Sequence, residues 1–254
     1  MRNLQRNCNS ALSNSSKMSQ NRIIMLPVPI GANSWQEMDT LNYREILTKN
    51  TIWVAENART LRRFISSLKL GIIIDSLEIF EFGGHANLLD LNKFLSEHIQ
   101  LGNIVVTSEA GLPGMADPGG IVAYWAHQNN IPVQSITGPG SIYLALQASG
   151  LNGQQFVFHG YTPVKEEELK TFIKDKAQQV KSTGYTQIFM ETPYRTERLF
   201  ATLLETLPAD MALCIARDLH GEAEWIQTLS IQNWKKSDLN MGKSPAVFLI
   251  GRPA

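Results

Sequence analysis

The strongest constraint on the fold is a series of short apolar runs that alternate with helical patterns through the first half of the chain. The run at residues 104–107 does not alternate between apolar and polar positions, which is typical of strands covered on both faces. Apolar residues recur at helical spacing between such runs, as at Leu61, Phe64, Ile65 and Leu68. Strand–helix alternation of this kind predicts an α/β fold with a mostly parallel sheet. Further strands are expected at residues 23–26, 52–54 and 131–136, with helices around residues 88–99 and 121–125.

The pattern changes beyond Gly150. Strands are expected at residues 156–159, 187–190, 213–216, 225–229 and 246–250, with a charged helix over residues 166–182. The last three of these strands have little helical pattern between them, which favours antiparallel pairing. We therefore predict an N-terminal α/β domain at residues 22–138 and a smaller mixed α/β domain at residues 139–254. Residues 1–21, rich in Ser and Asn, are expected to be a disordered tail.

Composition excludes several classes of protein. The 23 basic and 23 acidic residues give a formal net charge of 0, so a polyanion partner is not indicated, although a local basic face is compatible with this balance. The two cysteines and five histidines show no metal-ligand or disulfide spacing, and we expect no metal. The N-terminal segment lacks the apolar core of a secretory signal, and the apolar runs are too short to span a bilayer. We therefore expect a cytoplasmic protein without membrane association.

A glycine-dense loop at residues 108–119 is the clearest candidate for a ligand site. It follows the strand at residues 104–107 directly, and ligands of open α/β sheets bind at the carboxyl ends of strands. Glycine also allows a backbone to approach a ligand closely. The alternative is a long surface turn with no role, but long irregular loops in compact domains tend to be functional.

Two other segments follow strands in the same way. Gly138-Pro139-Gly140-Ser141 precedes a helical stripe, and a helix N-terminus offers free N–H groups to an anion or carboxylate. This segment is not a dinucleotide-binding fingerprint, because Tyr143 occupies the place of the third glycine. The segment at residues 191–195 follows another strand, so its charged residues either face a site or are solvated turn residues. Neither a phosphate-binding loop nor the nucleophile elbow of serine hydrolases occurs in the chain.

Together these segments resemble the small-subunit rRNA methyltransferase I group of the tetrapyrrole-methylase superfamily. The resemblance runs from about Ile24 to Gly251 and rests on ordered motifs at residues 26–31, 55–59, 108–119, 138–141 and 191–195. The chain departs from the group's pattern at several of them. It has Asn57 where the group has an aspartate, and Thr192 and Tyr194 where a serine and a histidine are usual. Within the loop it has Glu109, Gly111 and Leu112, where the group tends to have aspartate, glycine and threonine.

The resemblance implies a two-domain tetrapyrrole-methylase fold, a homodimer, and S-adenosylmethionine bound in the cleft between the domains. The acceptor in that group is the ribose 2′-hydroxyl of a cytidine in small-subunit rRNA. The residues that the resemblance assigns to the cofactor are Pro29, Ile30, Gly31, Ser108, Glu109, Ala110, Gly111, Met115, Ala116, Asp117, Pro118, Gly138, Pro139, Ser141, Glu191 and Thr192.

A ribose hydroxyl is a poor nucleophile, so a nearby base would assist its loss of a proton. The candidates are Glu191, Glu56, His85 and Glu109. Arginine suits phosphate geometry, and the candidates for binding RNA are Arg59, Arg195 and Arg217, with structural ion pairs as the alternative.

Two other functions compete with rRNA methylation. One is methylation of a small heterocyclic or tetrapyrrole-like acceptor, which zero net charge favours slightly. The other is an S-adenosylmethionine-binding regulatory dimer without catalysis, for which Asn57 and Tyr194 are the only support.

Overall fold

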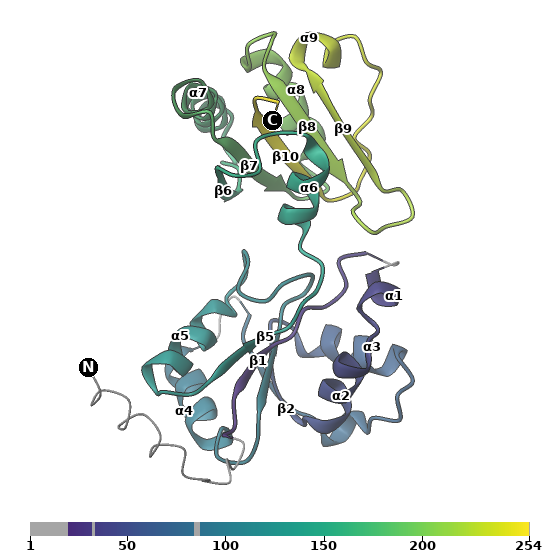
Figure 1. Ribbon diagram of the computed structural model, residues 1–254, viewed down its shortest axis with the longest axis vertical. Helices are drawn as coiled ribbons and strands as arrows, with labels where there is room; N and C mark the ends of the chain where they lie inside the picture. The colour runs from purple at the N-terminus through teal and green to yellow at the C-terminus, as the bar shows by residue number, and fades with distance from the viewer. Residues whose placement is uncertain (1–19, 32–33, 84–86, 254) are drawn as a thin grey trace, which may run out of the picture.

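The computed structural model describes residues 20–31, 34–83 and 87–253. Within them the chain forms two five-stranded sheets, which Figure 1 shows one above the other. The described chain passes from the first sheet to the second once, through the segment that leads into α6 (Ser141–Ser149). The predicted tail falls outside these residues except for Gln20 and Asn21, whose side chains donate hydrogen bonds to the carbonyls of Asn130 and Ile99.

The first sheet is parallel throughout, as predicted. Its order is β3-β2-β4-β1-β5, and every neighbouring pair is parallel. The strands are β1 (Ile23–Met25), β2 (Ile52–Ala55), β3 (Glu78–Glu81), β4 (Ile104–Thr107) and β5 (Val133–Ser135). The helices around this sheet are α1 (Ser34–Met38), α2 (Leu41–Lys49), α3 (Ala58–Ser67), α4 (Leu88–His98) and α5 (Gly120–Gln128), with a short 3-10 turn, η1, at Ile74–Ser76.

The central strands of this sheet are apolar at successive positions because helices cover both faces. Ile24 and Val105 pack with α1, α2 and α3 on one face, whereas Ile23 and Val106 pack with α4 and α5 on the other. Figure 1 shows the two helical layers on opposite sides of the strands. Burying each such side chain stabilises the fold by about 1.5–3 kcal/mol, so neither face could be left uncovered.

The second sheet is mixed, with the order β6-β7-β10-β8-β9. Its strands are β6 (Phe156–Tyr161), β7 (Thr186–Glu191), β8 (Ala212–Arg217), β9 (Trp225–Ser230) and β10 (Ala246–Gly251). Only β6 and β7 pair in parallel, and the predicted antiparallel pairing of the last three strands is confirmed, with β8 between β10 and β9.

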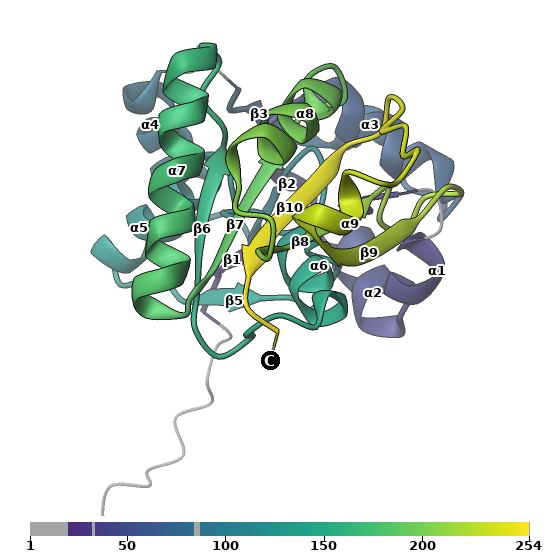
Figure 2. The same ribbon diagram turned by 90° about the horizontal axis from the view of Figure 1, so that it is seen from above.

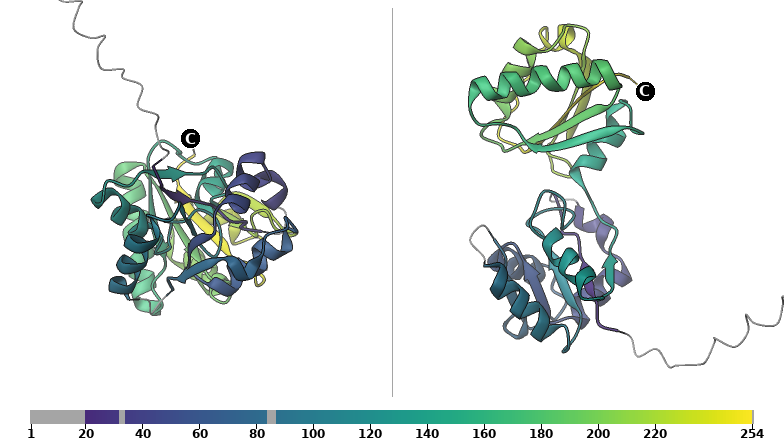
Figure 3. Two further views of the ribbon diagram at one scale, coloured as in Figure 1. Left: turned by 90° about the horizontal axis from the view of Figure 1, so that it is seen from below. Right: turned by 90° about the vertical axis from the view of Figure 1, so that its left-hand side faces the viewer.

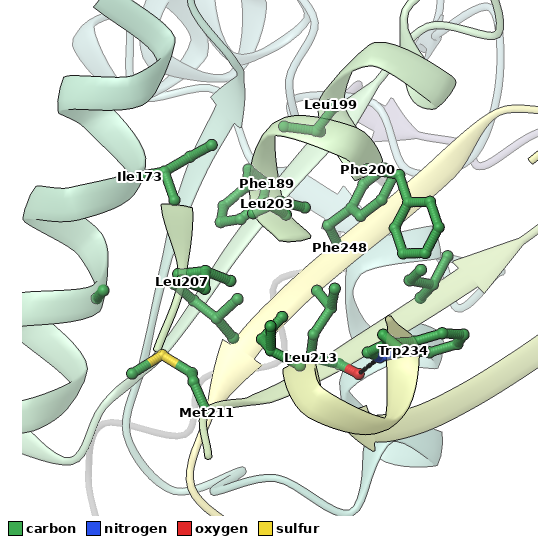
Figure 4. Close-up of a cluster of buried hydrophobic side chains, with 14 of the residues drawn as sticks. Ile173, Phe189, Leu199, Phe200, Leu203, Leu207, Met211, Leu213, Trp234 and Phe248 are labelled. Atoms are coloured by element: carbon green, nitrogen blue, oxygen red, sulfur yellow. Dashed lines mark hydrogen bonds between the residues drawn. The ribbon is translucent and has the colours of Figure 1, made fainter. Parts of the chain in front are cut away.

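Helices cover both faces of the second sheet as well. α7 (Glu166–Thr183), α8 (Thr196–Thr206) and α9 (Ile231–Trp234) pack on the face turned away from the first sheet (Figures 2 and 3). α6 packs on the opposite face, where it covers the buried free thiol of Cys214. Figure 4 shows the core under the outer helices, where the rings of Phe189 and Phe248 stack with centroids 6.3 Å apart. The buried indole of Trp234 donates to the Leu213 carbonyl at 2.8 Å, so its N–H is satisfied.

Candidate functional site

The two sheets turn their strand ends toward one another, and a cavity of about 330 Å³ lies there. From the first sheet, its walls are Ile30 after β1, Glu56 after β2, and residues 108–112 and 115–117 of the loop after β4. From the second sheet they include Tyr161 and Glu191, the last residues of β6 and β7. The carboxyl ends of parallel strands from both sheets therefore converge on one space, the usual place for a ligand in α/β proteins.

The register of the second sheet also brings the start of β10 to the cavity. Ala246, the first residue of β10, pairs with Glu191 on one side and with Arg217 on the other. The start of this antiparallel strand therefore lies beside the ends of β7 and β8. Ala246 and the neighbouring Val247 both line the cavity.

The loop at residues 108–117 is held in place by its own hydrogen bonds. The N–H and carbonyl of Gly111 pair with those of Val28 at 3.0 and 2.9 Å, which fastens the loop to the segment after β1. The carboxylate of Asp117 accepts hydrogen bonds from the N–H groups of Gly114 and Gly119 at 2.8 and 2.6 Å. Asp117 thus shapes the loop as well as lining the cavity.

Most residues that the resemblance assigned to the cofactor line this cavity. They are Ile30, Ser108, Glu109, Ala110, Gly111, Met115, Ala116, Asp117, Ser141, Glu191 and Thr192.

Pro29, Gly31, Pro118, Gly138 and Pro139 do not line it. The two glycines among them are needed for a different reason, which is the close approach of neighbouring chain segments. A Cβ on Gly31 would lie 2.5 Å from the backbone of His220, and one on Gly138 would lie 2.4 Å from the side chain of Pro27. These glycines allow close packing of chain segments, and at Gly31 the contact joins the two halves of the molecule.

Glu56 and Glu109 form an acidic pair on the first-sheet side of the cavity. The Thr60 hydroxyl donates to a Glu109 carboxylate oxygen at 3.2 Å, and the Glu109 N–H donates to Glu56 at 3.3 Å. Partial burial raises the pKa of the Glu109 carboxyl; the Thr60 hydrogen bond opposes this, and the negative charges of Glu56 and Glu81 add to it. Glu109 therefore has a stronger affinity for a proton than an ordinary glutamate.

The environment of Glu191 favours its charged form, the opposite of what is found for Glu109. Its side chain is 1% exposed and forms an ion pair with Arg195. One carboxylate oxygen accepts from the Thr162 hydroxyl at 2.6 Å, and the other accepts from the Thr192 N–H at 2.8 Å. Burial alone would raise the pKa of Glu191, but Arg195, Thr162 and Thr192 outweigh it and lower the pKa. Both oxygens are committed, so the geometry does not favour Glu191 as a base.

The arginines predicted to bind RNA differ in what they contact. Arg195 pairs with Glu191 and also donates to the Thr162 carbonyl at 2.9 Å. Arg217 donates to the carbonyls at residues 240 and 241 and lies over the Trp225 ring, 5.6 Å from its centroid. Arg195 thus forms an ion pair of the kind that the sequence left open as the alternative, whereas Arg217 is engaged with backbone carbonyls and an aromatic ring. Arg59, in contrast, is exposed on α3.

His85, the remaining candidate base, lies outside the described residues. Among the residues described, no group of three or more His, Cys, Asp or Glu side chains could hold a metal ion. None of the described helices combines the length and apolar character needed to cross a membrane.

Most of the apolar lining was not among the residues assigned to the cofactor from the sequence. Three unassigned lining residues do lie within the predicted motifs, namely Leu112, Gly140 and Pro193. The others are Ile142, Tyr143, Tyr161, Met190, Ala216, Leu219, Pro245, Ala246 and Val247. Met190 and Pro193 could have been found from their place beside Glu191 and Thr192. Ala216 and Ala246 could not, because they reach the cavity only through the strand order of the second sheet.

The fold is also found in proteins of known structure. The methyltransferase CobJ superposes with a TM-score of 0.59 at 16% identity, covering 92% of this chain and 95% of that one. The cobalt precorrin-4 methyltransferase CbiF superposes with a TM-score of 0.57 at 12% identity, covering 94% of this chain and 98% of that one. The chain has the fold of the tetrapyrrole methyltransferases.

Sequence relatives carry a different name. Ribosomal RNA small subunit methyltransferase I of Vibrio cholerae is 30% identical over 151 residues, which are 58% of this chain and 51% of that protein. The protein of the same name from Streptococcus pyogenes is 27% identical over 217 residues, 85% of this chain and 70% of that protein. The alignment thus spans about half the length of the Vibrio relative. No family model matches the chain. The proteins that it resembles in sequence and in fold are methyltransferases, and the resemblance inferred from its motifs is confirmed.

Proposed function

We propose that this protein is an S-adenosylmethionine-dependent methyltransferase that methylates the ribose 2′-hydroxyl of a cytidine in small-subunit rRNA, acting in the cytoplasm as a homodimer. The observation that carries the proposal is the cavity between the two sheets, lined by the loop at residues 108–117 and by the end of β7. Both segments belong to the motifs on which the resemblance rests, and the names of the sequence relatives point to small-subunit rRNA. The cytidine 2′-hydroxyl is what the resemblance implies.

The cavity suits the chemistry of S-adenosylmethionine. Its volume of about 330 Å³ falls within the range of small-molecule sites. Ile30, Ile142 and Val247 offer apolar surface to an adenine ring. At another wall, Ser141 begins α6, and the N–H groups at a helix start can bind a carboxylate.

When bound, this cofactor supplies an electrophilic methyl group. The protein's contribution is then to align the acceptor hydroxyl with that methyl group and to take up the proton. Alignment alone can contribute roughly 7–11 kcal/mol to lowering the barrier. The loop at residues 108–117 is suited to this task because Val28 and Asp117 hold its backbone.

Within the proposal, Glu109 accepts the proton. It lines the cavity, its raised pKa favours proton uptake, and its carboxylate accepts a single hydrogen bond from the described residues, that of Thr60. Glu191 is committed to Arg195, Thr162 and Thr192, and Glu56 accepts from the Glu109 N–H. Glu56 then acts on Glu109 as a neighbouring negative charge.

Methylation of a small heterocyclic acceptor is the second candidate. It is favoured by the apolar side chains in the wall, among them Leu112, Met115 and Met190, which would suit a flat apolar ring. The non-catalytic alternative loses support. Asn57 lies at the N-cap of α3, where its side chain accepts from the Thr60 N–H at 3.0 Å, a role that an aspartate could equally fill.

Two measurements test the proposal in order. Calorimetry with S-adenosylmethionine should give saturable binding to the full chain, and no binding at high micromolar concentration would exclude both enzymatic functions. Mass spectrometry of rRNA nucleosides should then show loss of one 2′-O-methylcytidine in a deletion strain and its return on complementation. An unchanged rRNA profile despite cofactor binding would favour the small heterocyclic acceptor.

A further inference from the structure

Helix α3 carries a concentrated patch of positive charge. Arg59, Arg62 and Arg63 all lie within it, and its sequence from Ala58 to Ser67 contains no acidic residue. Ala58, Leu61 and Ile65 are buried against the first sheet, so the three exposed arginines project from the other side of the helix. Residues three and four positions apart are neighbours on a helix surface, so Arg59 lies beside both other arginines. We call this surface the arginine face.

The arginine face has no direct partner in the described part of the chain, although the carboxylates of Glu81 and Glu109 accept hydrogen bonds at the start of the same helix. None of its three guanidinium groups forms an ion pair or hydrogen bond with a described residue. Elsewhere, Arg44 pairs with Asp39, and Lys170 pairs with Glu166 and Glu205.

This arrangement opposes helix stability. The arginines repel one another, and Arg59 lies in the first turn, where the helix dipole disfavours a cation. A cluster of this kind is stabilised when an anion binds to it.

The arginine face adjoins the cavity described above. Helix α3 begins two residues after Glu56, which lines that cavity. Its Thr60 hydroxyl donates to Glu109 at 3.2 Å, and Arg63 lies one helical turn beyond Thr60. The face therefore lies beside the loop at residues 108–117, where a polymer with one nucleotide in the cavity would continue.

We propose that the arginine face binds backbone phosphates of the single-stranded rRNA that flanks the target nucleotide. This inference rests on the proposed rRNA acceptor. The planar guanidinium binds phosphate oxygens in pairs, and phosphate contacts fix the register of a nucleic acid without reading its sequence. Arg62 and Arg63 would thus be positioning residues for the acceptor. An anionic membrane is the less favoured partner, because Thr60, Ser66 and Ser67 stand beside the arginines instead of the apolar side chains that insert into a bilayer.

The test is the salt dependence of RNA binding. Fluorescence anisotropy with a short dye-labelled single-stranded RNA is measured between ~50 and ~200 mM KCl for the full-length protein. The logarithm of the association constant falls as the logarithm of the salt concentration rises, and each phosphate contact contributes about 0.7 to the steepness of that fall. The variant R59A/R62A/R63A, which lacks three such contacts, should therefore have a slope smaller in magnitude by roughly 2. The triple lysine variant should keep most of the slope, because it keeps the charges.

Matched measurements separate this inference from the proposed function. Lys93→Ala removes an exposed cation from α4, on the other face of the first sheet, and should leave the slope unchanged. The triple alanine variant should bind S-adenosylmethionine as the wild type does, and its melting temperature should be unchanged or slightly higher because the repulsion between the arginines is removed. An unchanged RNA slope in that variant would overturn the arginine face while leaving the rRNA acceptor in place. Cofactor binding without any RNA binding by the wild type would overturn both. A triple variant that loses binding to phosphatidylglycerol vesicles but not to RNA would assign the face to a membrane.

Discussion

At the scale of single residues, two cavity glutamates are held in opposite electrostatic settings. Partial burial, with like charges nearby, raises the pKa of Glu109, whereas the Arg195 cation and two hydrogen-bond donors lower the pKa of the buried Glu191. Titratable groups whose environments push their pKa values apart commonly have different roles. We therefore expect Glu109 to act in proton transfer and Glu191 to hold the end of β7 in place.

Glu109→Gln should lower kcat by ~10²- to 10⁴-fold, the usual contribution of a general base, with little change in cofactor affinity. In the wild type, activity should fall on acidification through a pKa above the ordinary 4.5, and the substitution should remove this limb of the pH profile. A carboxyl with a raised pKa in the folded state costs stability above its unfolded pKa, so the variant should not be destabilised at neutral pH. Urea unfolding checks that point. Unchanged kcat in a folded variant would contradict the assignment.

Arg195→Ala should destabilise the protein strongly at neutral pH. It leaves the 1%-exposed carboxylate of Glu191 without its cation, which typically costs about 3–5 kcal/mol. Because the folded pKa of Glu191 is lowered, the stability from this ion pair is present above the ordinary value of 4.5 and is lost as pH falls through the lowered pKa. Urea unfolding across pH should therefore show a difference from the wild type that shrinks in acid. The exposed pair Lys49–Glu45 is the control, since Lys49→Ala should cost about 0.5 kcal/mol or less at any pH. A pH-independent cost would point to lost packing of Arg195 instead.

At the scale of elements, Arg63→Glu in α3 should change stability and RNA binding in opposite directions. The substitution replaces the repulsion between Arg59 and residue 63 by an attraction at the same four-residue spacing. The free energy of unfolding should rise by about 0.2–0.5 kcal/mol, while RNA affinity at low salt falls. Chemical denaturation and anisotropy on the same preparation measure both. A variant that is stabilised and binds RNA normally would show that the arginine face has no part in binding.

Some elements were predictable because their apolar pattern alone decides them. The run at residues 104–107 has no polar alternation because helices cover both faces of β4, and α7 was expected from its charged sequence and apolar stripe. β3 was not predicted, since it is an edge strand with Glu78 and Glu81 at its ends and only two apolar residues between them. α1 and α2 lie in a polar stretch and depend on tertiary packing against the first sheet. α8 was not predicted either, although its apolar residues recur at helical spacing between two expected strands.

Parts of the candidate site that continue directly from a strand in sequence were predictable. Parts that reach the site only through the order of strands in the sheet were not. The loop at residues 108–117 continues directly from β4, so its place at a strand end could be inferred. Ala246 reaches the same cavity only because β10 inserts between β7 and β8, an order that no local pattern encodes. Likewise, the engagement of Arg195 depends on Thr162, 33 positions away in sequence.

At the scale of the whole molecule, the cavity depends on how the two sheets are held together. The backbone at His220, in the turn between β8 and β9, packs directly on Gly31 after β1. The His220 ring also lies 3.4 Å from a carboxylate oxygen of Glu37 on α1. The segments that follow β1 and β8 therefore meet at a second contact, away from the single chain connection before α6.

Gly31→Ala should weaken cofactor binding although Gly31 does not line the cavity. The added Cβ would lie 2.5 Å from the backbone of His220 and 2.7 Å from the Gly221 nitrogen, and backbone cannot rotate away as a flexible side chain can. The two sheets must then separate slightly at this contact, at a typical cost of ~1–3 kcal/mol, and the walls of the cavity move apart with them. A loss of ~1.4 kcal/mol in binding corresponds to a tenfold higher Kd for S-adenosylmethionine. Gly153→Ala is the matched control, since a Cβ there meets nothing within 4 Å, and it should leave Kd unchanged. If Gly31→Ala binds the cofactor as tightly as Gly153→Ala, the spacing of the two sheets does not set the shape of the cofactor site.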